Sequence, residues 1–132
     1  MSVRNKRLTH SDRVFNFLKK QKQPLTAYEI LDLLRSEGIT AATTVYRALD
    51  KLVEIGKIHK IESRNAFIAC KNSKCQITKA TVFSICENCE DVKEIHDHKL
   101  SEHLKHYKDN KGMKYSKYNL EFFGLCKKCI KN

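Results

Sequence analysis

Four of the six cysteines form two Cys-x-x-Cys pairs, Cys86 with Cys89 and Cys126 with Cys129. Each pair presents two thiolates from one tight turn, and together they supply the four soft ligands of a tetrahedral zinc site. Four thiolates leave no open coordination position, so the site is expected to be structural rather than catalytic. The pairs lie far apart in the sequence, so the ion would tie the beginning of one domain to its end.

The alternative for these pairs is a redox role, in which a Cys-x-x-Cys opens a helix as in thioredoxin-like proteins. We expect neither pair to open a helix, which favours the metal site. In a reducing compartment the cysteines are expected to be metal ligands or free thiols rather than disulfides. Zinc bound in this way would also stabilise the fold of a small domain.

A second group of functional residues lies on a predicted helix that opens near Thr43 or Thr44. Tyr46, Arg47 and Lys51 share the face opposite its apolar positions. An arginine there can make a bidentate contact with guanine in the major groove, and the helix N-terminal amides near Thr43 and Thr44 can bind a phosphate. The alternative is an ordinary solvated helix face.

Two further helices are expected to hold this one in place. Capping boxes predict one helix from Thr9 to about Gln21 and another that begins after Thr26 and ends at Gly38. The helix that carries Arg47 ends before Gly56, where a left-handed residue is needed.

The third helix is followed by a predicted hairpin of residues 57–62 and 66–70. Lys57 and Arg64 lie on or beside this hairpin, where a wing would meet the DNA backbone. Three helices and a hairpin predict a winged helix-turn-helix.

The rest of the chain predicts a β-β-α-β unit. Residues 81–85, 91–95 and 118–123 are β-rich, and Leu100 and Leu104 indicate a helix between the last two strands. A small sheet covered by one helix leaves apolar surface that a second copy can bury. The predicted fold is therefore α+β, with a winged-helix DNA-binding domain in residues 1–70, a hinge in residues 71–80, and a zinc-binding dimerisation domain in residues 81–132.

The composition fits a cytoplasmic protein that binds a polyanion. The formal net charge is +11, and nucleic acid is the commonest partner of a basic soluble domain, although a generally basic surface is the alternative. We find no run long enough for a membrane span, no signal segment and no Gly-rich phosphate loop. We therefore expect no membrane association, no small-molecule substrate and no enzymatic activity.

These motifs resemble the ferric uptake regulator family. The matching segments are residues 44–52 with Gly56, residues 85–89 and residues 124–129, while residues 27–32 and 59–63 resemble the zinc uptake regulator branch. The resemblance implies a homodimer that binds palindromic operators when loaded with metal and represses metal-uptake genes. It also implies that Tyr28 and Arg47 contact bases.

The resemblance further implies a regulatory metal site at the hinge. His59, Cys70 and Glu94 match three ligands of that site, and they suit zinc. Lys79 stands where the family usually has a histidine, and a protonated lysine cannot bind a metal ion. We expect Cys75 to supply the fourth ligand. The alternatives are that Cys75 is an incidental surface thiol and that His96 or His98 takes this place.

The leading prediction is a zinc-dependent repressor with one structural and one regulatory zinc per subunit. The alternatives are an iron or peroxide sensor of the same family and a constitutive zinc-stapled DNA-binding protein that has lost metal sensing. Four histidines near the predicted C-terminal helix are read as solvated residues or as a secondary metal site: His96, His98, His103 and His106.

Overall fold

The computed structural model describes residues 8–70 and 80–131. The chain divides into two compact units, residues 1–71 and 72–132. The predicted hinge lies outside the described residues except for Ala80, where a strand begins. Within the described ranges, no helix is long and apolar enough to cross a membrane.

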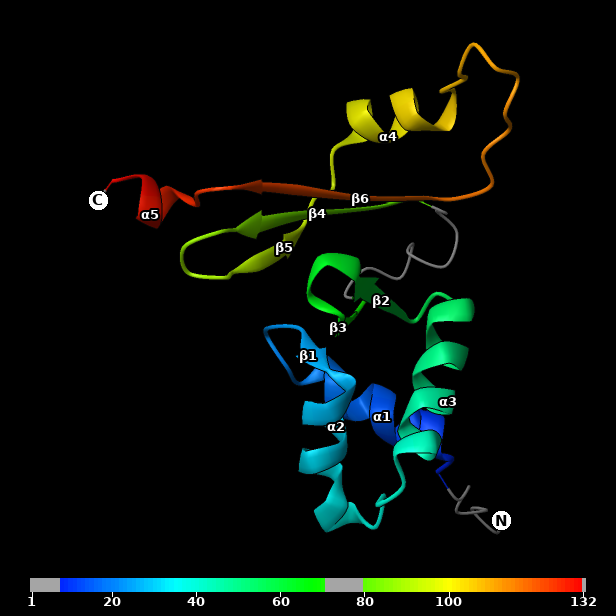
Figure 1. Ribbon diagram of the computed structural model, residues 1–132, viewed down its shortest axis with the longest axis vertical. Coiled ribbons are helices and arrows are strands. Elements are labelled where there is room, and N and C mark those ends of the chain that lie inside the picture. The colour runs from blue at the N-terminus through cyan, green and yellow to red at the C-terminus, as the bar shows by residue number, and fades with distance from the viewer. Residues whose placement is uncertain (1–7, 71–79, 132) are drawn as a thin grey trace, which may run out of the picture. The chain divides into compact units, whose positions relative to one another are not determined.

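The first unit contains three helices and a three-stranded sheet, in blue to green in Figure 1. The elements are α1 (His10–Lys19), β1 (Leu25–Thr26), α2 (Ala27–Leu34), η1 (Arg35–Glu37), α3 (Ala42–Glu54), β2 (Ile58–Ile61), η2 (Glu62–Arg64) and β3 (Ala66–Ala69). This order confirms the predicted winged helix-turn-helix, although α3 begins one residue before the predicted start.

Both predicted capping boxes are present. The hydroxyls of Thr9 and Thr26 accept hydrogen bonds from the amides of Asp12 and Glu29, each at 3.1 Å, and both carboxylates accept the return bond from the capping residue. Gly38 ends the second helical segment with φ +88°, a left-handed conformation that residues other than glycine seldom adopt. The helix boundaries are thus determined by local sequence.

The sheet has the strand order β1-β3-β2. Strands β2 and β3 form the predicted antiparallel hairpin, in which Ile58 pairs with Ala69 and Asn65 takes a left-handed conformation at the turn. Strand β1 was not predicted. It has two residues and adds to the outer edge of β3 by pairing Leu25 with Phe67.

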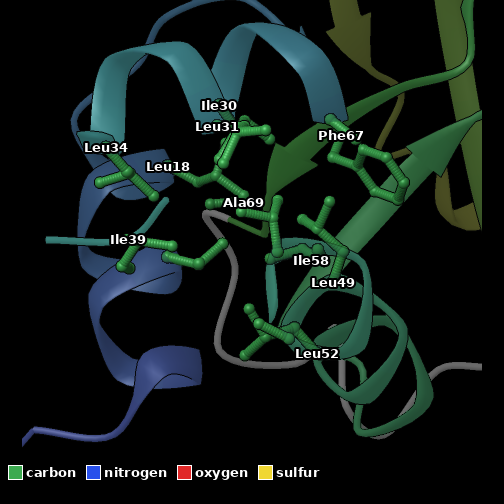
Figure 2. Close-up of a cluster of buried hydrophobic side chains, with 14 residues drawn as sticks. Leu18, Ile30, Leu31, Leu34, Ile39, Leu49, Leu52, Ile58, Phe67 and Ala69 are labelled. Atoms are coloured by element: carbon green, nitrogen blue, oxygen red, sulfur yellow. The ribbon is translucent and has the colours of Figure 1, made fainter. Parts of the chain in front are cut away.

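One apolar core fixes the helices against this sheet (Figure 2). Leu18 of α1, Ile30 and Leu34 of α2, Leu49 of α3 and Ile58 of β2 are each at most 1% exposed. Burying an aliphatic side chain of this size is worth about 1.5–3 kcal/mol. The apolar stripe of α3 is therefore held inward, and the polar face of α3 must point outward.

The second unit is a three-stranded sheet with two helices. Its elements are β4 (Ala80–Cys86), β5 (Val92–Glu94), α4 (His98–Lys105), β6 (Tyr118–Gly124) and α5 (Lys127–Ile130). The strand order is β5-β4-β6, with β4 antiparallel to β5 and parallel to β6. The predicted β-β-α-β unit is confirmed, while the four-residue α5 was not predicted.

Candidate metal centre and nucleic-acid interface

The two Cys-x-x-Cys pairs meet at one edge of the second sheet. Because β4 and β6 are parallel and in register from Ala80 with Tyr118 to Cys86 with Gly124, their carboxyl ends lie together. Cys86 ends β4 and Cys89 lies in the turn that follows, while the residues after β6 carry the second pair.

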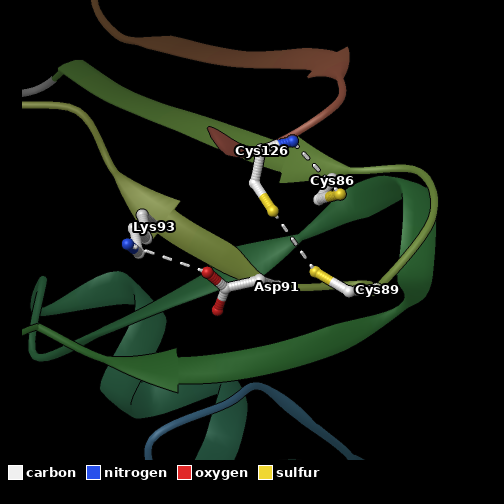
Figure 3. Close-up of polar contacts among 5 residues, drawn as sticks. All are labelled: Cys86, Cys89, Asp91, Lys93 and Cys126. Atoms are coloured by element: carbon white, nitrogen blue, oxygen red, sulfur yellow. Dashed lines mark hydrogen bonds and ion pairs between the residues drawn. The ribbon is translucent and has the colours of Figure 1, made fainter. Parts of the chain in front are cut away.

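The four sulfurs form one cluster. The Sγ atoms of Cys86, Cys89, Cys126 and Cys129 all lie within 4.8 Å of one another. Figure 3 shows Cys89 and Cys126 pointing toward each other, with their Sγ atoms 3.7 Å apart. Sulfurs at such separations from four positions suit a tetrahedral ion bound at about 2.3 Å from each sulfur.

Hydrogen-bond donors point at two of the sulfurs. The Cys126 amide donates to Cys86 Sγ at 3.3 Å, and Asn88 Nδ2 donates to Cys129 Sγ at 3.3 Å. The turn that carries Asn88 is held by the Glu87 amide, which donates to the carbonyl of Gly124 at 2.8 Å. Donors of this kind stabilise a thiolate over a thiol.

The ionisation of the four thiols shows why a cation fits. Backbone N–H groups of Cys89 and Cys126 lower the pKa of Cys86 to about 6. At Cys89 the Asp91 amide lowers the pKa, but the neighbouring Cys86 thiol and burial outweigh it and raise the pKa to about 11. Four clustered thiols therefore cannot all ionise by themselves, and a divalent cation such as Zn²⁺ supplies the missing positive charge.

The second Cys-x-x-Cys pair does not follow the expectation that neither pair opens a helix. Cys126 is the N-cap of α5, so the second Cys-x-x-Cys does open a helix, although a helix of only four residues. Four residues are too few to show the apolar periodicity from which a helix is predicted. The metal assignment now depends on the clustering of all four sulfurs, which a pair of separate redox motifs does not require.

The residues predicted to contact DNA all lie on the first unit. Thr43, Tyr46, Arg47 and Lys51 are exposed on α3, and Thr44 is half-buried. Tyr28, at the first turn of α2, has 71% of its surface exposed. The N-cap of α3 is Ala41, which makes no side-chain cap hydrogen bond.

The two predicted wing residues lie at opposite ends of the hairpin. Arg64 ends η2 at the turn between β2 and β3. Lys57 precedes β2 at the other end, and its Nζ lies 5.1 Å from the centre of the Phe15 ring, as does Nζ of Lys19. The ammonium group of Lys57 thus makes an internal cation–π contact, which the sequence did not reveal.

The predicted regulatory ligands are only partly described. His59 on β2 is buried at 7% exposure, and one of its ring nitrogens lies within 4.8 Å of Cys70 Sγ. Glu94 ends β5, and burial raises the pKa of its carboxyl group. Cys75 and Lys79 lie outside the described residues.

Cys70 lies just after β3 and is half-buried. Its role as a reduced metal ligand stays a prediction. The four clustered cysteines of the second unit are free thiols. Thiols close enough to share an ion are also close enough to oxidise to a disulfide, and metal binding by Cys70 requires its reduced form.

A winged helix with an exposed basic reading face, on the same chain as a four-thiol cluster, defines a metal-binding transcription regulator. The family model "Ferric uptake regulator family" matches residues 4–123. The chain belongs to this family.

Zinc uptake regulators are among the proteins that this chain resembles. The zinc uptake regulation protein of Escherichia coli (strain K12) is 35% identical over 129 residues, which cover 96% of this chain and 75% of that protein. The crystal structure of holo XcZur has a TM-score of 0.81 at 35% identity, over 98% of this chain and 90% of that one. A zinc uptake regulator complexed with zinc and DNA has a TM-score of 0.79 at 37% identity, over 97% and 86%. These likenesses confirm the predicted family and fold class.

Proposed function

We propose that this protein is a zinc-dependent transcriptional repressor that binds operator DNA in the cytoplasm and controls zinc-uptake genes. The proposal depends on one observation: the chain combines a four-thiol cluster with an exposed Arg47. Its fold is shared with a zinc regulator that was solved in complex with zinc and DNA. Membership of the family makes the chain a regulator rather than an enzyme.

Zinc dependence of DNA binding is the decisive test. Duplexes selected from a random-sequence library with the zinc-loaded protein provide the operator probe, and fluorescence anisotropy measures its affinity with zinc and after chelation. Tighter binding with zinc, and not with an equal concentration of Fe²⁺, is expected. Equal affinity with and without zinc would contradict the proposal in favour of a constitutive DNA-binding protein.

The first zinc is assigned to Cys86, Cys89, Cys126 and Cys129, where its role is structural. A chelator should lower the far-ultraviolet circular dichroism of the second unit, because metal binding by such a site supplies folding free energy. Cys126→Ser should bind one zinc fewer per subunit than the wild type. An unchanged zinc content in Cys126→Ser would show that the four sulfurs do not hold the ion.

The second zinc is assigned to His59, Cys70, Glu94 and Cys75, and it is the regulatory ion. The proximity of His59 and Cys70 supports this assignment, as does a donor set of imidazole, thiolate and carboxylate. Under reducing conditions the wild type should bind two zinc ions per subunit, whereas His59→Ala and Cys75→Ala should bind one tightly. If Cys75→Ala keeps full affinity at the second site, Cys75 is not a ligand.

The DNA contacts are assigned to Tyr28, Arg47 and the neighbouring polar positions of the winged helix. The assigned phosphate and base contacts also include Thr43, Thr44, Tyr46, Lys51 and Arg64, while Lys57 is expected to contribute less because its ammonium group packs on Phe15. Arg47 has the bidentate donor geometry that reads guanine.

A homodimer is the proposed assembly. Strand β6 and the residues that follow it expose several large apolar side chains: Phe122 at 48%, Phe123 at 54%, Leu125 at 52% and Ile130 at 67%. Large apolar side chains exposed on one short segment favour a surface that a partner covers. Sedimentation equilibrium should give twice the subunit mass, and a monomer at micromolar concentration would contradict the assignment.

A further inference from the structure

The second unit carries a concentrated positive charge that the proposed function does not use. Five lysines recur at every third position from the last residue of α4 to the residue before β6: Lys105, Lys108, Lys111, Lys114 and Lys117. All five are exposed. We call residues 105–117 the lysine loop.

The lysine loop carries little compensating negative charge. Its one acidic residue is Asp109, so five lysines leave a formal net charge of +4 in thirteen residues. Among the residues that the structure describes, none of the five lysines takes part in an ion pair. Exposed ammonium groups without a counter-ion are available to an external anion.

Asp109 holds the backbone of the loop in a defined shape. Its Oδ1 accepts hydrogen bonds from the amides of Lys111 and Met113, both at 3.0 Å, and its Oδ2 accepts one from the Tyr115 hydroxyl at 2.8 Å. Gly112 between them has φ +78°, which allows the tight turn. The single carboxylate is therefore occupied within the loop, and the lysines are presented from an ordered turn.

Three tyrosines support the same turn. The ring of Tyr115 lies 5.9 Å from that of Tyr107 and 6.3 Å from that of Tyr118, measured between centroids. These ring contacts restrain both ends of the lysine loop. The hydroxyl of Tyr115 donates to Asp109, so this residue supports the loop through both its ring and its hydroxyl.

We propose that the lysine loop is a second DNA-contacting surface, which binds the phosphate backbone of duplex DNA without reading its sequence. Lysines are depleted from protein–protein interfaces, whereas protein–DNA interfaces are strongly positive. The three-residue spacing allows at most about 10 Å between neighbouring lysine Cα atoms, so successive ammonium groups can reach separate phosphates of one duplex. A lysine is a point charge, which suits contacts that add affinity and not specificity.

This inference rests on the proposed function, because it assigns an added contact to a DNA-binding protein. It predicts that the loop raises the affinity for all duplexes equally. The ratio of operator affinity to random-sequence affinity should stay the same when the loop is neutralised, and the salt dependence should fall.

The test compares two triple variants of the full zinc-loaded protein. Lys108→Gln, Lys111→Gln and Lys114→Gln neutralise the loop, while Lys93→Gln, Lys99→Gln and Lys131→Gln remove the same charge from exposed positions of the same unit. Zinc content and circular dichroism establish that both variants fold. The measurement is the dissociation constant for a random-sequence duplex between about 50 and 200 mM salt.

The loop variant should show a slope of log affinity against log salt that is smaller by about 2 to 3, because each lost phosphate contact removes about 0.9. The control variant should keep the wild-type slope. Equal slopes for the two variants would overturn the proposal. So would a loss confined to anionic phosphatidylserine vesicles, which would identify a membrane contact.

The outcomes separate this inference from the proposed function. If the wild type shows no zinc-dependent operator binding, the proposed function fails, yet the random-sequence comparison still tests the loop. If operator binding depends on zinc and the loop variant keeps the full slope, only the loop proposal fails.

Discussion

The hydrogen bond from Asn88 to the thiol cluster predicts that a residue outside the ligand set controls zinc affinity. Asn88→Ala removes the donor that lies 3.3 Å from Cys129 Sγ and leaves all four sulfurs in place. Without that donor the negative charge on the Cys129 thiolate is less well balanced, so zinc should bind more weakly.

The size of the expected loss of zinc affinity follows from the exposure of Asn88. Removing a group that supports a metal ligand typically costs 10–100-fold in metal affinity. Asn88 is exposed, so water partly replaces its N–H group, and the lower end applies. We expect zinc affinity to fall about tenfold, or about 1.4 kcal/mol. Asn88→Asp should cost more, because it places a carboxylate against a thiolate.

Competition with a chelating dye measures the affinity, and the rate of zinc transfer to the dye gives a second readout. Glu87→Gln, in the same turn, is the control, because the backbone amide of Glu87 and not its side chain holds that turn. If Asn88→Ala and Asn88→Asp both bind zinc as tightly as the control, the hydrogen bond does not tune the site and the reasoning is refuted.

Further predictions concern the first unit. Arg47→Ala should weaken operator binding by about 1–3 kcal/mol and relax specificity at one position, while Lys51→Ala should lower the salt slope of binding by about 1 on every sequence; a uniform loss for Arg47→Ala would mean that it contacts phosphate. Thr26→Ala should lower the free energy of unfolding by about 1 kcal/mol in urea titrations, because it removes a cap; an effect below the error would mean that water replaces the hydroxyl. Hydrogen bonds from Thr9, first from its amide, lower the pKa of Asp12. The stability that the ionised Asp12 carboxylate adds to the folded protein is therefore fully present above the unfolded pKa of about 3.9. It is lost as the pH falls through the lower folded pKa. Asp12→Asn should make the free energy of unfolding fall less steeply as the pH is lowered. An unchanged fall would show that Asp12 does not contribute to it.

Local signals account for the parts of the fold that the sequence predicted correctly. Thr9 and Thr26 each stand three residues before an acid, and this spacing defines a helix start from a few neighbouring residues. The helical spacing of Val45, Leu49 and Leu52 likewise determines the buried face of α3 without reference to the rest of the chain. These features need no information from distant segments.

Two of the features that the sequence did not reveal depend on distant partners. Strand β1 has only two residues and exists because Leu25 meets Phe67, so no local period reveals it. The parallel pairing of β4 with β6 follows from the topology of the whole unit. Helix α5 has four residues and no apolar stripe that could have indicated it.

The same division applies to the candidate sites. The cysteine quartet was recognisable because spacing alone shows that two thiols share a turn. The roles of Asn88 and Asp109 could not be recognised from the sequence. Asparagine and aspartate are common in turns and loops, and their hydrogen-bond partners are known only once the chain is folded. The contact of Lys57 with the Phe15 ring was not predictable either, because Phe15 lies on α1, far from Lys57 in the sequence.

The parallel register of β4 and β6 also has a kinetic consequence. These strands pair only after the connection from Cys86 to Tyr118 has closed, and long closures make folding slow. An ion bound by cysteines on both sides of that connection offsets the entropy cost of closing it as soon as both sides are bound. The rate at which new subunits mature should therefore rise with free zinc, so that zinc limits the supply of the protein as well as its activity.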